Sequence, residues 1–214
     1  MPTGLICGDP HGSFSHIIDF ARINHPDVIF LLGDMDLTRP LNVELEDILN
    51  ATQIYWIHGN HDTDSEASYK NLFGSSLAKN NLHGRVVTVL GLRVAGLGGV
   101  FRKKIWDGVR EEYDSPEQYC RTCGKGNLWE GGLPLKHRSS IFPSDILQFA
   151  SMSADLLLTH EAPDMHRYGN VRVTQLAKDL GVRSAFHGHH HEEIDYQNGV
   201  WFGVGLRGLR EIRW

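Results

Sequence analysis

The chain has 214 residues and a formal net charge of −5 at pH 7. This length suits a single α/β domain with a sizeable core, and the acidic balance gives no global attraction to nucleic acid or to an anionic membrane. No apolar run approaches the ~20 residues of a transmembrane helix. The start of the chain shows neither the basic region nor the small-residue cleavage site of a signal peptide, so we expect a cytoplasmic protein with no membrane partner.

The N-terminal part alternates between strand and helix signals. Apolar runs at residues 5–7, 28–32 and 54–57 each reach a glycine within two residues, which is typical of strands buried on both faces. Between them, Ser13 is placed to cap a helix, and residues 40–50 predict a second one. This βαβαβ order implies parallel strands joined by right-handed crossovers.

The C-terminal part contains more strand signals. Residues 85–90 and 92–97 flank Gly91 and predict a hairpin. Helices are expected at residues 143–152 and 171–180. Further strands are expected at residues 156–158, 184–187, 194–196 and 200–204. The pattern predicts an α/β fold in which two mixed sheets pack face to face between helices, a four-layer α-β-β-α sandwich.

Residues 101–142 interrupt this alternation with many glycines, aromatics and charges. Unstructured segments of this length are often lids or binding loops, so we interpret the segment as an insertion in a single domain spanning residues 1–214. Basic residues near its ends, including Arg102, Lys136 and Arg138, are candidates to bind a substrate phosphate. The alternative is a solvated charged loop.

The three cysteines, an odd number, do not make a disulfide framework. Cys120-x-x-Cys123 resembles half of a zinc site, but the remaining cysteine, Cys7, is expected inside the first strand. We therefore expect free thiols. Of the many histidines, His187 and His190 are expected to point away from any ligand site that their neighbours form, because strand side chains alternate in direction.

Five clusters of Asp, Asn and His follow the predicted strands. They are Asp9-x-His11, Gly33-Asp34, Gly59-Asn60-His61-Asp62, His160 and Gly188-His189-x-His191. The carboxyl ends of strands in an open α/β sheet are where ligands bind, so the clusters are expected to converge. Their oxygen and nitrogen ligands suit Mn²⁺, Fe or Zn²⁺, and two such ions about 3.5–4 Å apart can clamp a phosphoryl group and activate water. The sequence therefore predicts a two-metal hydrolase in which Asp34 bridges the ions.

In this order, the five clusters resemble the calcineurin-like metallophosphoesterases, over residues 5–204 apart from the insertion. The resemblance implies two ligand sets. One metal would be held by Asp9, His11, Asp34 and His191, and the other by Asp34, Asn60, His160 and His189. His61 would lie beside the scissile phosphate and stabilise charge or protonate the leaving oxygen. Mn²⁺ is the favoured ion.

Departures from the family narrow the expected substrate. The protein-phosphatase branch carries an acidic residue three positions after the bridging aspartate, where this chain has Leu37. The third cluster ends in Asp62, as in many small phosphodiesterases and nucleases of the family. We expect hydrolysis of phosphodiester or nucleotide-type substrates by a metal-bound hydroxide. The alternatives are a phosphomonoesterase and a non-catalytic interaction scaffold. The group that orients His61 is left open between Asp62 and Asp36.

Overall fold

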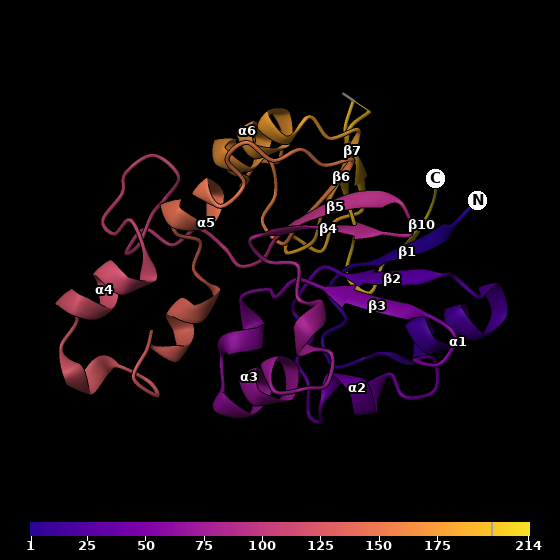
Figure 1. Ribbon diagram of the computed structural model, residues 1–214, viewed down its shortest axis with the longest axis horizontal. Coiled ribbons are helices and arrows are strands. Elements are labelled where there is room, and N and C mark those ends of the chain that lie inside the picture. The colour runs from indigo at the N-terminus through magenta and orange to yellow at the C-terminus, as the bar shows by residue number, and fades with distance from the viewer. Residues whose placement is uncertain (198) are drawn as a thin grey trace.

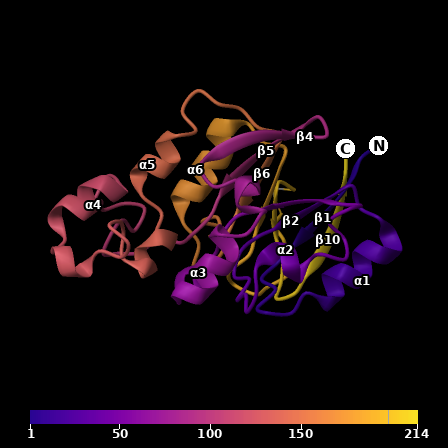
Figure 2. The same cartoon turned by 60° about the horizontal axis from the view of Figure 1, so that its bottom comes forward.

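The computed structural model describes residues 1–197 and 199–214 and contains two mixed sheets packed face to face (Figures 1 and 2). The first sheet has the strand order β10-β1-β2-β3. In it β1 (Thr3–Cys7), β2 (Val28–Leu31) and β3 (Gln53–Trp56) run parallel. The last strand, β10 (Leu209–Arg213), returns to pair antiparallel with β1.

The second sheet has the order β4-β5-β6-β7-β9-β8. Its strands are β4 (Arg85–Val89), β5 (Leu92–Leu97), β6 (Leu156–Thr159), β7 (Ser184–His187), β8 (Ile194–Asp195) and β9 (Trp201–Gly203). The central strands β5, β6, β7 and β9 run parallel. The edge strands β4 and β8 pair antiparallel with β5 and β9. The predicted hairpin and the two mixed sheets are confirmed.

Helices cover the outer faces of both sheets (Figure 1). Those of the first sheet are α1 (Ser15–Asn24), α2 (Leu41–Glu44) and α3 (Glu66–Phe73). Those of the second are α5 (Pro143–Leu147) and α6 (Val171–Leu180). Short 3₁₀ helices are η1 (His61–Thr63), η2 (Ala78–Asn80), η3 (Lys125–Asn127) and η4 (Leu135–Ser139). In the part of the chain that the structure describes, no helix has the length and apolar character of a membrane span.

Alternate residues of the buried strands enter different layers of the core. In β2, Ile29 faces the helix layer with Ile17, whereas Phe30 lies in the cluster between the two sheets. In β6, Leu158 joins the same intersheet cluster, and Leu157 packs into the layer beneath α6. The continuous apolar runs of the sequence therefore reflect strands that are covered on both faces.

Several element boundaries differ from the sequence-based expectation. The first helix begins at Ser15, with Phe14 at the N-cap, so Ser13 is not the cap. Only Leu41–Glu44 of the predicted 40–50 helix and Pro143–Leu147 of the predicted 143–152 helix are α-helical. After each, the chain continues in turns with hydrogen bonds between residues three apart. Such turns keep nearly the same apolar face, which is why the sequence pattern did not distinguish them from a helix.

The segment 101–142 is an ordered part of the molecule. It contains α4 (Pro116–Thr122) and two of the 3₁₀ helices, and it extends to one side of the sheets (Figure 1). Its base is closed by a bridge between Val100 and Ser140. Trp106 and Phe142 are almost fully buried in the core layer beneath α6.

Candidate metal centre

The residues predicted as metal ligands converge along one edge of the two sheets. Asp9 follows β1, Asp34 follows β2 and Asn60 follows β3. From the second sheet, His160 follows β6, and the pair His189 and His191 follows β7. The parallel register between neighbouring strands brings these carboxyl ends together.

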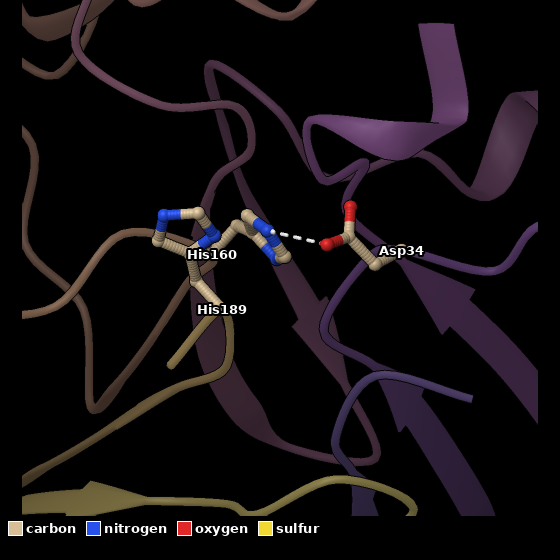
Figure 3. A group of neighbouring side chains, drawn as sticks. All are labelled: Asp34, His160 and His189. Carbon is tan, nitrogen blue, oxygen red and sulfur yellow. Dashed lines mark ion pairs between the residues drawn. The ribbon is translucent and has the colours of Figure 1, made fainter. Parts of the chain in front are cut away.

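Asp34 lies between the two ligand groups. Its Oδ2 is 3.3 Å from His160 Nε2 and 4.0 Å from His11 Nε2. Its Oδ1 accepts a hydrogen bond of 2.8 Å from the His61 backbone N–H. Figure 3 shows the His160 ring between Asp34 and His189, whose ligand atoms all lie within 4.8 Å of one another. Asp34 is therefore the candidate for a carboxylate shared by the two groups.

The first ligand group is formed by Asp9, His11 and His191 together with Asp34. The Nε2 atoms of His11 and His191 are 3.0 Å apart, close to the ~3 Å expected between two neighbouring ligands that each lie ~2.1 Å from one ion. The opposite nitrogen of His11, Nδ1, donates to Asp36 Oδ2 at 2.5 Å. Because Nδ1 carries the proton, the lone pair on Nε2 is left for a metal.

The second ligand group is formed by Asn60, His160 and His189 together with Asp34. His160 Nε2 is 3.2 Å from Asn60 Oδ1. Its Nδ1 donates to the carbonyl oxygen of Leu32 at 2.7 Å, which fixes the tautomer and directs Nε2 into the site.

Local geometry supports the presence of cations. Asp9 Oδ1 is buried and has no hydrogen-bond partner among the described residues. A Cβ on Gly59 would lie 2.1 Å from Asp34 Oδ1, and a Cβ on Gly188 would lie 2.6 Å from Asp9 Oδ1, so both glycines make room for these carboxylates. Five proposed ligands adopt a positive φ that is costly for residues other than glycine. They are Asp9, His11, Asp34, His189 and His191. Strain of this kind is concentrated at functional sites, and the donor set fits two divalent ions.

The carboxylates also favour positive charge at this edge. Burial raises the pKa of Asp9 to about 6, so a positive charge beside this carboxylate favours its ionised form. Burial alone would lower the pKa of His160, yet Asp34 and Asp9 raise it to about 10. Burial also acts to raise the pKa of Asp34, but His160 and the His61 N–H hold it below its usual range. This is the electrostatic condition for holding divalent cations.

His61 is oriented by a residue that the sequence did not identify. Its Nδ1 donates to Asp64 Oδ2 at 2.6 Å. Burial acts to lower the pKa of His61, but Asp64 and Asp34 raise it above its usual value. The two candidates considered from the sequence have other partners: Asp36 holds His11, and the buried Asp62 accepts backbone N–H bonds from Asp34, Met35 and Gly59. The 3₁₀ turn η1 explains the pairing, because it places residues three apart on the same side.

His190 lies beside the proposed ligand His189, with ring centroids 4.6 Å apart, and so does not point away from the site as the sequence suggested. His187 Nε2 is 2.9 Å from the Tyr196 hydroxyl, and the His190 ring stacks on His166 with centroids 4.0 Å apart. Glu161, which the sequence did not single out, lies 3.6 Å from His190 Nε2, and with His190 and His189 it forms a second compact group of metal-ligand types.

The basic residues of the insertion occupy different environments. Arg138 donates to the Tyr69 hydroxyl at 2.8 Å and to the Trp129 carbonyl at 3.2 Å. Lys136 is exposed and lines a separate pocket of about 430 Å³. Their role in substrate binding stays a prediction. Both cysteines of the Cys-x-x-Cys motif are free thiols, and the groups of metal-ligand types found in the described chain contain neither.

Three kinds of comparison relate the chain to known proteins. The chain is 41% identical over 209 residues, or 97% of its length, to an uncharacterized protein of Haemophilus influenzae, of which 92% is covered. Its fold is similar to that of TT1561 of Thermus thermophilus (TM-score 0.61, 14% identity, 97% of this chain and 90% of that one). It is also similar to phosphopantetheinyl hydrolase PptH of Mycobacterium tuberculosis (TM-score 0.58, 12% identity, 99% and 95%). The family model of calcineurin-like phosphoesterases matches residues 4–193, and the chain therefore belongs to that family.

Proposed function

We propose that the chain is a two-metal phosphoesterase that acts on phosphodiester or nucleotide-type substrates. Family membership supports the coarser statement, a metal-dependent phosphoester hydrolase. The observation that supports the two-metal part of the proposal is the position of Asp34, whose Oδ2 lies between His160 and His11 and so between the two proposed ligand groups. The first ion would be held by Asp9, His11, Asp34 and His191, and the second by Asp34, Asn60, His160 and His189. Mn²⁺, Fe and Zn²⁺ all suit these ligands, and Mn²⁺ is the one we favour.

The bound ions would supply Lewis acidity that neutralises phosphoryl charge and lowers the pKa of water toward neutrality. The chain's own contribution is to position ligands and to move a proton. His61 lies beside the first ligand group, with its ring centroid 5.6 Å from that of His11. Since Asp64 holds Nδ1 and favours the charged imidazole, Nε2–H is available to protonate the leaving oxygen.

The charges around the site favour a diester over a monoester. Three carboxylates that are not proposed ligands lie close to it: Asp36 on His11, Asp64 on His61, and Glu161 beside His189. A phosphodiester carries one negative charge and a monoester close to two at neutral pH, so repulsion from these groups is weaker for the diester. Leu37, at the place where protein phosphatases of the family carry an acid, is buried in the apolar layer beneath α1.

The test compares substrates under controlled metal content. The purified protein is stripped with a chelator and supplied with Mn²⁺, Fe²⁺ or Zn²⁺, and rates are measured on bis(p-nitrophenyl) phosphate and p-nitrophenyl phosphate. The diester should be the better substrate, with two metal equivalents bound. His61→Ala should keep both metals and lose about 10²–10⁴ in turnover, whereas His25→Ala, on an exposed histidine at the end of α1, should match the wild type. Faster monoester hydrolysis would establish the phosphatase alternative, and bound metal without hydrolysis of either ester would favour the scaffold.

A further inference from the structure

The two ends of the insertion meet beside the edge of the sheets where the proposed metal ligands lie, which we call the metal edge. Ser139, at the end of η4, places its Oγ 2.7 Å from Thr63 Oγ1 and 3.5 Å from the carbonyl oxygen of Asn60. From the other end, Arg102 Nη2 donates to the same Ser139 Oγ at 3.0 Å. The guanidinium of Arg102 is thus one side chain away from the loop that carries Asn60 and His61.

Arg102 has unused donors in a partly buried position. Its Nε–H is buried and has no hydrogen-bond partner among the described residues. A guanidinium offers five N–H donors, and Ser139 is the one acceptor that the described structure gives to this one. Burial lowers the pKa of Arg102, while the carboxylates of Asp64, Asp34 and Glu161 act to raise it. None of these carboxylates forms an ion pair with Arg102 in the described chain, although all three flank the metal edge. A buried donor of this kind requires an acceptor from elsewhere.

The other basic residues of the insertion do not share these properties. The guanidinium of Arg138 is held by protein acceptors and packs over the rings of Tyr69 and Trp129. Lys104 and Lys136 line the separate pocket on the insertion itself. Lys103 is exposed, so it provides the same charge as Arg102 without its burial.

We infer that Arg102 binds a non-bridging phosphoryl oxygen of the substrate, and that Ser139 positions it to do so. This inference rests on the proposed function, because it assigns a residue of the insertion to the same site. Planar guanidinium donors match phosphate oxygens better than an ammonium does. The insertion then determines substrate affinity through a residue at its base, where its two ends are joined.

The test uses inorganic phosphate as a probe of binding that does not depend on turnover. Mn²⁺-loaded wild type, Arg102→Ala, Arg102→Lys and Lys103→Ala are compared by calorimetric titration with phosphate and by KM and kcat on bis(p-nitrophenyl) phosphate. Arg102→Ala should weaken phosphate binding and raise KM about 10- to 100-fold, the scale for losing charge-assisted hydrogen bonds, with two metal equivalents retained. Arg102→Lys should recover part of the loss, and Lys103→Ala should stay within about twofold of the wild type, because an exposed charge contributes little.

One further variant keeps the outcomes distinct. Arg102→Gln fills the half-buried position with a neutral polar side chain, so it remains informative if Arg102→Ala folds poorly. It should show the same loss of phosphate binding. If Arg102→Gln and Arg102→Lys both bind phosphate as Lys103→Ala does, the inference is wrong, whatever the hydrolytic activity. If phosphate binding depends on Arg102 but the wild type hydrolyses neither ester, the inference stands and the proposed function fails.

Discussion

Asp36 and Asp64 each accept a hydrogen bond from a histidine of the site, and substituting them should have different effects. Asp36 accepts from His11 at 2.5 Å, with side chains 40% and 20% exposed. Asp64 accepts from His61 at 2.6 Å, with side chains 58% and 46% exposed. Because His11 is a proposed ligand and His61 is not, Asp36→Asn should act on metal affinity and Asp64→Asn on turnover. The two substitutions are matched in chemistry and in hydrogen-bond length.

The magnitudes follow from these environments. Removing the carboxylate that orients a metal-bound histidine typically costs 10- to 100-fold in metal affinity, so Asp36→Asn should weaken one of the two metals by about that factor. An exposed ion pair contributes about 0.2–1 kcal/mol, which corresponds to a loss of about 1.4- to fivefold in kcat for Asp64→Asn. The Asp64 variant should lose more on a poor leaving group than on nitrophenolate, since only the former needs a full proton transfer.

Metal titration of the stripped variants, followed by kcat at saturating metal, separates the two effects. Asp36→Asn should regain most of its turnover when excess Mn²⁺ is added, and Asp64→Asn should not respond. The reasoning is refuted if Asp64→Asn loses a metal equivalent, or if Asp36→Asn binds both ions normally and is still slow.

Three other predictions concern the bridge, the insertion and the pH dependence of stability. Asp34→Asn should lower occupancy of both metals, whereas Asn60→Ala should mainly weaken one; two full equivalents in Asp34→Asn by elemental analysis would remove the bridging assignment. Trp106→Ala deletes an indole that is 2% exposed and should cost about 3–5 kcal/mol of unfolding free energy in denaturant titrations; a loss below about 1 kcal/mol would show that the insertion does not support the core. Hydrogen bonds from Arg93 lower the pKa of Asp155 to about 2, below its ordinary value of about 3.9, so its stabilisation should be full above about pH 4 and lost as pH falls toward 2. Wild type and Asp155→Asn should therefore differ in unfolding free energy at pH 7 and converge near pH 2, and a difference independent of pH would contradict this assignment.

The sequence predicted the convergence of the ligand clusters because strand ends can be read from where apolar runs stop. Leu32, for example, is the last residue of an apolar run, and Gly33 and Asp34 follow it directly. The strand β10 escaped prediction since three of the five residues of Leu209–Arg213 are charged and because it pairs with β1 from the far end of the chain. The partner of His61 required knowledge of the turn η1, and the environment of Arg102 required the contact between the two ends of the insertion. Local patterns therefore placed the proposed ligands together. The partner of His61 depends on a turn type that the pattern does not reveal, and the environment of Arg102 depends on a tertiary contact.

The ligand positions were predictable from residue type, but the backbone strain that they carry was not. His189 has φ 71°, a left-handed conformation that costs a residue with a side chain about 1 kcal/mol and costs glycine little. His189→Gly and His189→Ala both remove the imidazole and differ only in a Cβ, so their comparison sets this strain against the greater unfolded-state entropy of glycine. In chelated protein, His189→Gly should be more stable than His189→Ala by about 1 kcal/mol in urea unfolding, the reverse of the order seen in a regular helix or strand. Both variants should lose one metal equivalent. If His189→Ala is the more stable of the two, the backbone at this position is not strained. The left-handed conformation of the proposed ligands would then no longer support a site that binds metal at the expense of stability.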